Sequence, residues 1–494
     1  MKKQRGAGIL MPISSLPSPY GIGTLGAEAY HFVDQLDKAG QKYWQVLPVG
    51  PTSFGDSPYQ SFSAFAGNPY FIDLDELVKQ GLLTKEEIEA YDWGDDAEQV
   101  DYATLYQNRF PLLHKAYERS EHKQTKSFRK FQSANRYWLE DYSFYMALKF
   151  YFGGQEWSLW EDSLKYRRKD ALVKYKELLQ EEIGFWQFAQ YHFFDQWKKL
   201  KKYANKKGIK IIGDIPLYVA LDSADVWTHT DLFELDERKR PTQVAGVPPD
   251  CFSEDGQRWG NPLYCWKRMK KDGYDWWKHR MQANAALYDV IRIDHFIGIV
   301  HYWSIPAECP TAVEGKWRKG PGKHLTKVIR KATKGSDIIA EDLGIVSDQV
   351  RALINQTGWP GMKILEFAFD GGAENEYLPH HYQNSNCIVY GGTHDNQTLM
   401  GYYGNRTPEQ LSFLMKYLHI KKVKQIPKAM LRLAYGSIAD TVIFQMQDIL
   451  ELDDTARMNE PSTVGTNWRW RMKPGAFQKE QISRLKKYCT IYDR

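Results

Sequence analysis

Short runs of apolar residues, each bounded by turn residues, recur eight times along the chain. Runs of this length without a polar face are typical of buried parallel strands. Helical patterns lie between them, most clearly over 185–207, where apolar residues follow i, i+3, i+4 spacing until Gly208. The predicted strands are residues 8–13, 43–49, 209–219, 290–299, 337–343, 362–369, 387–391 and 441–446.

The repeated order of strand and helix predicts an α/β fold, a (β/α)8 TIM barrel, with a doubly wound open sheet as the alternative topology. The uneven spacing of the strands indicates long insertions, and the segment 77–180 holds no strand candidate. We therefore expect one barrel domain over 1–494. Its insertions are expected at about 52–208 (a helical subdomain), 222–288 (a loop region) and 397–440 (a helical insertion).

Charge, cysteine content and the length of apolar runs exclude several classes of protein. The chain has 66 basic and 61 acidic side chains, a net charge of +5 over 494 residues, which gives no case for nucleic acid or a membrane surface as a partner. Its five cysteines are scattered and form no CxxC pair, so neither a disulfide framework nor a zinc ribbon is predicted. No apolar run reaches the length of about 18 residues that a membrane span needs. We expect a cytoplasmic protein.

Residues 21–26 (GIGTLG) match the glycine fingerprint of dinucleotide-binding proteins. Prolines separate these glycines from the preceding strand, and 40–45 holds no acidic residue to bind a ribose. The sequence therefore favours a loop that turns into a helix over 27–39. No phosphate-loop, zinc-protease or serine-hydrolase signature occurs either, and no cofactor is predicted.

Acidic residues at strand ends are the candidate chemistry. Four predicted strands end in ionisable side chains, and in a parallel barrel such ends converge on one mouth. These residues are Asp214, Arg292 with Asp294, Glu341 with Asp342, and His394 with Asp395.

Asp294 and Glu341 form the predicted catalytic pair. Arg292 and Asp294 lie two residues apart, on the same side of one strand, so the guanidinium is expected to lower the pKa of Asp294 and keep it ionised. Glu341 ends the next strand and would carry a proton. One ionised and one protonated carboxyl, about 5–5.5 Å apart, suit retaining cleavage of a glycosidic bond. Asp395 could hold sugar hydroxyls, and the aromatic content of 14% also suits sugar binding.

Ten blocks in order along the chain resemble the amylomaltases, the 4-α-glucanotransferases of glycoside hydrolase family 77. The blocks are GILMPISSLP (8–17), WQVLP (44–48), DSPYQ (56–60), GDIPLYV (213–219), AGVPPD (245–250), WGNP (259–262), RIDHF (292–296), AEDLG (340–344), GTHDN (392–396) and NWRWR (467–471). The resemblance implies transfer of α-1,4-glucan segments from a donor maltooligosaccharide to the 4-hydroxyl of an acceptor glucan or glucose, by a retaining double displacement without cofactor or metal.

The same resemblance implies a role for each site residue. Asp294 would be the nucleophile, Glu341 the acid/base and Asp395 the transition-state stabiliser. Arg292 would orient Asp294, and His394 would bind a hydroxyl of the reacting glucose. The implied sugar-binding residues are Ser57, Tyr59, Asp214, Pro249, Asp250, Trp259 and Asn467.

The resemblance makes the barrel the catalytic domain and the insertion 222–288 its lid and acceptor loop region. The loop 246–259 resembles the family's lid over the acceptor, although an aromatic residue is common where this chain has Cys251. A retaining α-glucan hydrolase remains the alternative function, and an inactive glucan-binding protein is a third possibility. The sequence does not set the oligomeric state.

Overall fold

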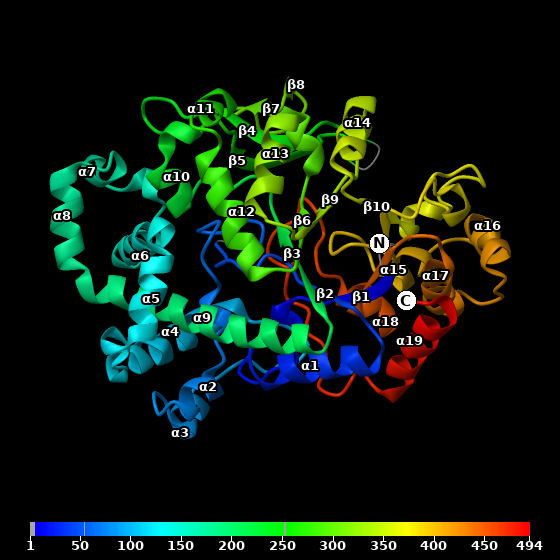
Figure 1. Ribbon diagram of the computed structural model, residues 1–494, viewed down its shortest axis with the longest axis horizontal. Helices are drawn as coiled ribbons and strands as arrows, with labels where there is room; N and C mark the ends of the chain where they lie inside the picture. Colours follow the sequence, from blue (N-terminus) through cyan, green and yellow to red (C-terminus); the bar gives the residue numbers. More distant parts are fainter. Residues whose placement is uncertain (1–4, 54, 251–252) are drawn as a thin grey trace.

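A computed structural model describes residues 5–53, 55–250 and 253–494 of the chain. Eight parallel strands lie near its centre (Figure 1), and each coincides with a predicted apolar run. They are β1 (Gly6–Leu10), β2 (Tyr43–Gln45), β3 (Lys210–Ile215), β6 (Val290–Ile293), β9 (Asp337–Ala340), β10 (Gly361–Ile364), β11 (Cys387–Tyr390) and β12 (Thr441–Gln445).

The eight strands close into a (β/α)8 barrel. Their order is β10-β11-β12-β1-β2-β3-β6-β9, and all the neighbours pair in parallel. The two ends of this row meet, since the backbone N–H of Ala340 at the end of β9 donates to the carbonyl of Pro360, just before β10, at 3.0 Å. An open doubly wound sheet would leave two free edges, so the barrel prediction is confirmed.

Several strands are shorter than their apolar runs. β3 ends at Ile215 because Pro216 has no N–H to continue the ladder. β6 ends at Ile293, and a 3-10 helix (Phe296–Ile299) takes up the rest of the run. In both places the chain leaves the sheet where the acidic side chains begin, and the barrel mouth forms there.

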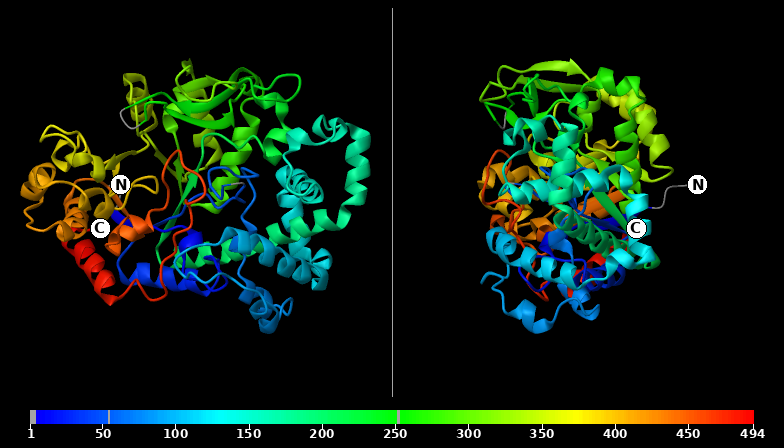
Figure 2. Two further views of the ribbon diagram at one scale, coloured as in Figure 1. Left: turned by 180° about the vertical axis from the view of Figure 1, so that it is seen from behind. Right: turned by 90° about the vertical axis from the view of Figure 1, so that its left-hand side faces the viewer.

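Helices wrap the barrel. Helix α9 covers nearly the predicted span, and its buried face carries Phe185, Phe188 and Phe193. In Figures 1 and 2 α1 and α19 lie along one side of the strands, and both views show the N- and C-terminal regions close together. The outer helices are α1 (Ala27–Lys38), α9 (Gln180–Lys206), α12 (Asp275–Leu287), α13 (Lys323–Ala332), α14 (Asp348–Thr357), α17 (Ile426–Gly436), α18 (Met446–Ile449) and α19 (Lys479–Tyr492).

The glycines of 21–26 are explained by packing. A Cβ atom on Gly23 would lie 1.8 Å from the carbonyl oxygen of Ile13, and one on Gly26 would lie 1.9 Å from a carboxylate oxygen of Asp73. Gly26 is the residue before α1, so the segment is the predicted loop leading into a helix. Its glycines allow close contact between chain segments.

Most of the large insertion between β2 and β3 is helical. In the described part of the chain it forms no strand, and its outer helices make the lobe at the far left of Figure 1. Before α9 it contains α2 (Leu74–Lys79), α3 (Lys85–Glu89), α4 (Tyr102–Arg119), α5 (Lys126–Ala134), α6 (Arg136–Tyr151), α7 (Asp162–Lys165) and α8 (Lys169–Leu178).

A small antiparallel sheet that the sequence analysis did not predict lies beside the barrel mouth. Its order is β5-β4-β7-β8, and two of its strands come before β6 and two after it. The strands are β4 (Gln243–Val247), β5 (Gln257–Pro262), β7 (His301–Pro306) and β8 (Lys316–Lys319), and the short helices α10 (Ala224–Thr228) and α11 (Trp266–Lys271) flank the first pair.

Between β11 and β12 the chain forms α15 (Leu399–Gly404) and α16 (Pro408–Leu418) before α17. None of the helices among the described residues has the length and apolar character to cross a bilayer.

Candidate active site

Asp294 and Glu341 lie side by side at the barrel mouth. Asp294 follows Ile293 of β6, and Glu341 follows Ala340 of β9. Ile293 and Ala340 are partners in the parallel ladder. The N–H of Glu341 donates to the carbonyl of Ile293 at 3.1 Å. Neighbouring strands run about 4.8 Å apart, which places the two carboxyl groups at one position of the mouth. Their separation of about 5–5.5 Å stays a prediction.

Arg292 links two of the predicted carboxylates. Its Nη1 atom lies 2.7 and 2.6 Å from the two oxygens of Asp214 and 3.0 Å from Oδ1 of Asp294. The ladder explains this arrangement, because Asp214 and Arg292 are partners in the pairing of β3 with β6. The Asp214 side chain is fully buried, whereas 27% of the Asp294 side chain is exposed. Arg292 and Asp214 therefore form a buried ion pair, and Asp294, which also binds Arg292, is partly exposed at the mouth.

The pKa of Asp294 moves in the opposite direction to the one predicted from the sequence. Burial raises it to about 6, although Arg292 pulls it down. The guanidinium is shared with Asp214, whose own charge also raises the pKa of Asp294. Burial cannot be read from the local sequence, and it outweighs the two neighbours that lower the pKa of Asp294, Arg292 and His394.

Glu341 keeps its proton more firmly than Asp294. Burial raises its pKa to about 8, and the charge of Asp294 adds to that rise against the opposing effect of Arg292. Its two oxygens accept the backbone N–H groups of His295 at 2.6 Å and Leu343 at 2.7 Å, which fix the carboxyl group. At pH 7 the pair therefore favours an ionised Asp294 and a protonated Glu341.

A second charged group lies across the mouth on the turn after β11. Nε2 of His394 lies 3.3 Å from Oδ2 of Asp395. Burial alone would raise the pKa of Asp395, but the charge and hydrogen bond of His394 outweigh it, and the pKa falls to about 2. Asp395 in turn raises the pKa of His394 against burial. Asp395 is therefore ionised at neutral pH.

Tyr59 connects the two halves of the site. Its hydroxyl donates to Oδ2 of Asp214 at 2.9 Å and lies 3.4 Å from Nδ1 of His394. Its ring stacks on His394 with centroids 5.0 Å apart, and Trp468 packs beside both rings. Aromatic rings at a polar mouth are suitable surfaces for the C–H faces of sugar rings.

Two residues that the sequence analysis missed hold Asp395. Nδ2 of Asn459 donates to Oδ1 of Asp395 at 2.6 Å, and Nη2 of Arg457 donates to the Asp395 carbonyl at 3.1 Å. Both lie in an irregular segment after α18. They follow no strand end, so the signal that revealed the other residues is absent.

The remaining predicted contacts lie around this centre. Ser57 precedes Tyr59 in the same loop and accepts its N–H at 3.3 Å. The Trp259 ring meets the His295 ring edge to face at 4.8 Å, which places it near Glu341. Pro249 and Asp250 are exposed, and Asp250 accepts the N–H of Ser253. Cys251 lies outside the described residues.

Asn467 is engaged within its own loop. Its Nδ2 donates to the Glu460 and Thr463 carbonyls and to the Thr463 hydroxyl, at 3.0–3.2 Å, and its Oδ1 accepts the N–H of Glu460 at 3.0 Å. These contacts shape the 460–467 loop beside Asn459. Its predicted contact with sugar would have to replace or share one of these bonds.

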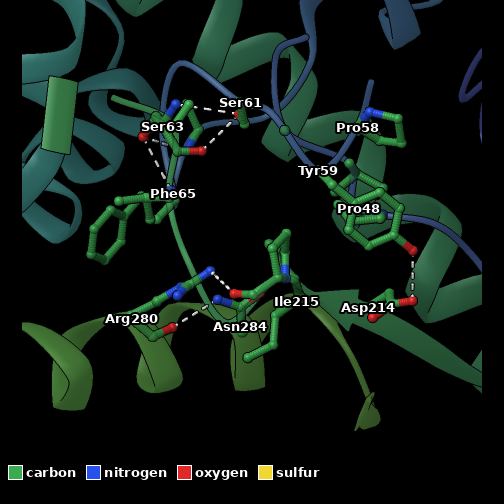
Figure 3. Close-up of a pocket in the computed structure, with 18 of the residues that line it drawn as sticks. Pro48, Pro58, Tyr59, Ser61, Ser63, Phe65, Asp214, Ile215, Arg280 and Asn284 are labelled. Carbon is green, nitrogen blue, oxygen red and sulfur yellow. Dashed lines mark hydrogen bonds between the residues drawn. The ribbon is translucent and has the colours of Figure 1, made fainter. Parts of the chain in front are cut away.

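Tyr59 and Asp214 line a pocket beside this centre. Figure 3 shows the loop carrying Ser61 and Ser63 on one side of it and Arg280 and Asn284 of α12 on the other. The guanidinium of Arg280 donates to the carbonyls of Pro216 and Leu217, the residues that follow β3. It thereby fixes the end of the strand that carries Asp214.

A model of the family described as 4-alpha-glucanotransferase, glycoside hydrolase 77, matches residues 11–478. The chain is 47% identical to the 4-alpha-glucanotransferase of Clostridium butyricum over 98% of its own length and 100% of the relative. The chain belongs to glycoside hydrolase family 77, the 4-alpha-glucanotransferases.

Further relatives of this family 77 chain agree. It is 48% identical to the 4-alpha-glucanotransferase of Streptococcus pneumoniae (strain TIGR4), across 100% of the chain and 98% of the relative. Its structure matches the amylomaltase of Streptococcus agalactiae in complex with acarbose with a TM-score of 0.96, at 43% identity, over 99% of this chain and 100% of that one. The likeness covers the whole family 77 architecture, including the insertions.

Proposed function

We propose that this family 77 protein transfers α-1,4-glucan segments between maltooligosaccharides, with Asp294 as nucleophile and Glu341 as acid/base. The observation that carries the assignment is geometric: Asp294 and Glu341 follow paired residues of neighbouring strands, Arg292 binds Asp294, and two backbone N–H groups bind Glu341. Burial raises the pKa of both carboxyl groups, and that of Glu341 more. An ionised nucleophile beside a protonated acid is what a retaining reaction requires.

In the first step Glu341 donates its proton to the oxygen of the scissile bond while Asp294 attacks the anomeric carbon. The reducing-end fragment leaves with that proton, and a glucosyl ester forms on Asp294. Arg292 holds one oxygen of Asp294, so the other is left for attack. The carboxylate of Asp395, which stays ionised because its pKa is about 2, stabilises positive charge on the sugar ring.

In the second step the ionised Glu341 removes the proton from the 4-hydroxyl of an acceptor glucan or glucose. That oxygen displaces Asp294 from the anomeric carbon, and two inversions give net retention. A water molecule in the acceptor's place would give hydrolysis. We propose that the 246–259 segment and Trp259 favour the sugar by positioning it and excluding water.

The predicted domain organisation gives this reaction its setting: one catalytic barrel with three insertions around its mouth. We place the reaction in the cytoplasm, where the scattered cysteines would remain thiols. Cys265, Cys309, Cys387 and Cys489 are unpaired among the described residues.

The test of this function is incubation of the purified protein with maltotriose alone. Transfer predicts glucose together with a ladder of longer maltooligosaccharides. Glucose and maltose without longer products would establish the alternative, a retaining α-glucan hydrolase. Binding of maltotriose without any product would indicate an inactive glucan-binding protein.

A further inference from the structure

Two buried carboxyl groups that the proposed mechanism does not use lie behind the turn carrying His394 and Asp395. Glu366 stands at the start of the 3-10 helix Leu365–Phe369, directly after β10, and is 3% exposed. Asp448 belongs to α18 and is 4% exposed. Carboxyl groups this deeply buried are uncommon unless a partner or a proton compensates them.

Glu366 is bound to the turn through Asn396. Nδ2 of Asn396 donates to Oε1 of Glu366 at 3.1 Å. Oδ1 of Asn396 accepts the N–H of Thr393 at 2.8 Å and the Thr393 hydroxyl at 2.9 Å, which closes the turn 393–396. Through one amide, Glu366 therefore holds the segment from which His394 and Asp395 project.

The backbone of Glu366 is fixed as well. Its N–H donates to the carbonyl of Gly391 at 3.0 Å, and its own carbonyl accepts the hydroxyl of Tyr403 at 2.9 Å. Because the side chain starts from a fixed point and ends on Asn396, its length and shape set the position of the turn.

The other oxygens of the two acids have no hydrogen-bond partner among the described residues. These atoms are Oε2 of Glu366 and Oδ2 of Asp448. They face two adjacent glycines, since a Cβ atom on Gly392 would lie 3.0 Å from Oε2 and one on Gly391 would lie 3.3 Å from Oδ2. Two full charges left without donors in this space would be costly, so a proton on Glu366 is favoured.

The charged groups around Glu366 support a neutral acid. Burial raises its pKa well above the usual range, and Asp448 and Asp454 raise it further. Arg457 and the amide of Asn396 act in the opposite direction and are outweighed. Burial raises the pKa of Asp448 to about 7, although that group accepts the N–H of Leu399 at 2.8 Å.

We propose that Glu366 is a neutral carboxylic acid that positions the 393–396 turn, and through it Asp395, for the transfer reaction. It touches neither substrate nor reacting atoms, so it is a positioning residue. The inference rests on the proposed function, because it assigns Asp395 a role in that reaction. A neutral acid presents Asn396 with a carbonyl-type oxygen, which a glutamine amide also provides in a side chain of the same length.

The test compares Glu366→Gln with Glu366→Leu in the disproportionation of maltotriose. Glutamine is expected to keep kcat within about twofold of wild type. Leucine removes the acceptor for Asn396, and we expect it to lower kcat by about tenfold while KM changes by less than about threefold. Thermal unfolding of each variant shows whether it is folded. Glu376→Gln is the matched control, because the Glu376 side chain is 56% exposed and lies beyond hydrogen-bond distance of its ion-pair partners Arg351 and Lys363, at 3.7 and 3.6 Å.

A second variant breaks the same contact from the turn. Asn396→Ala leaves the buried acids in place and is expected to reproduce the fall in kcat, so the test holds even if Glu366→Leu does not fold. Each change is then repeated with Asp395→Asn. If Glu366 acts through Asp395, its loss should cost much less in that background.

Three results would overturn the proposal. Glutamine as damaging as leucine would mean that the charged form is needed. An unchanged kcat in both Glu366→Leu and Asn396→Ala would mean that the contact positions nothing. The same fold-loss with and without Asp395 would mean that the effect does not pass through it. Absence of longer maltooligosaccharides from the wild-type protein would instead refute the proposed transfer itself.

Discussion

Nη1 of Arg292 lies 3.0 Å from Oδ1 of Asp294, yet the pKa of Asp294 is about 6, above its usual range. The same nitrogen atom lies 2.6 Å from the fully buried Asp214, so its charge is divided between two acids. Burial then decides the outcome. Asp294 is thus ionised at neutral pH but only moderately acidic, which suits a group that must both attack and later leave an anomeric carbon.

The two carboxyl groups predict a bell-shaped pH profile of kcat/KM for maltotriose. Asp294 must be ionised, so activity should fall below about pH 6, and Glu341 must be protonated, so it should fall above about pH 8. Because the two groups interact, the two apparent values belong to the pair. Initial rates of glucose release between pH 4.5 and about 9.5 measure the profile. A flat profile through pH 8 would contradict the role of Glu341.

Loss of Arg292 should shift the acidic limb of that pH profile to higher pH. Without the guanidinium, the pKa of Asp294 rises and Asp214 is left as an unpaired buried charge. We expect Arg292→Gln to lower kcat/KM by at least about 100-fold at pH 7, from the cost of breaking a buried ion pair. Arg136→Gln is the control, because its pair with Glu140 is exposed. An unchanged acidic limb in a folded variant would argue against Arg292 as the group that lowers the pKa of Asp294.

Asn459 should affect the rate of transfer because it holds the carboxylate of Asp395. Its amide donates to Oδ1 of Asp395 at 2.6 Å, and hydrogen bonds to charged groups are worth about 1.5–3 kcal/mol. Asn459→Ala is therefore expected to lower kcat by about 10- to 100-fold. Asn459→Asp should be worse, since it places a second negative charge beside Asp395. If steady-state kinetics give both variants wild-type kcat, the contact has no part in catalysis.

A buried histidine in the helical insertion, His192, should make the free energy of unfolding decrease as the pH falls. His192 is 4% exposed, its ring nitrogens have no hydrogen-bond partner among the described residues, and burial lowers its pKa to about 4. In the unfolded chain His192 takes up a proton near pH 6.5, whereas in the folded protein it does so only near pH 4. The free energy of unfolding is therefore highest above pH 6.5 and declines as the pH falls toward 4. The decline for His192 alone is roughly 3 kcal/mol.

Denaturant unfolding at pH 7 and pH 4.5 measures this dependence. His192→Gln should be less stable at pH 7 but should lose less stability on acidification than the wild type. An equal loss in both proteins would show that His192 does not take up the proton. His122, which lies near His192 and whose pKa burial also lowers to about 4, is expected to account for part of the remaining dependence.

The barrel was predictable because each of its strands coincides with a short, mainly apolar run bounded by turn residues. The small sheet was not, because β8 is Lys316–Lys319, almost wholly charged, and β5 contains Gly260 and Pro262. β4 also pairs with β7 across β6, so that Gln243 and its partner Pro306, for example, are 63 positions apart in sequence. Strand propensity depends on such partners, which local patterns do not contain.

The site was predictable where residues follow barrel strands and not elsewhere. Asp214, Arg292, Glu341 and His394 were found from their places at strand ends, and the structure brings them to one mouth. Asn459 was missed because it lies in an irregular segment. The direction of the pKa of Asp294 was wrong because it depends on burial and on the division of Arg292 between two acids.

The central claim is that Asp294 carries the sugar between the two steps. The Glu341→Gln variant, given α-glucosyl fluoride, can form the ester because fluoride leaves without an acid, but it cannot readily pass the sugar on. Mass spectrometry of its peptides should find one or more anhydroglucose units attached to Asp294, and Asp294→Asn should abolish the adduct. Attachment to Asp395 or another residue, or retaining turnover by Asp294→Asn at the wild-type rate, would contradict the account.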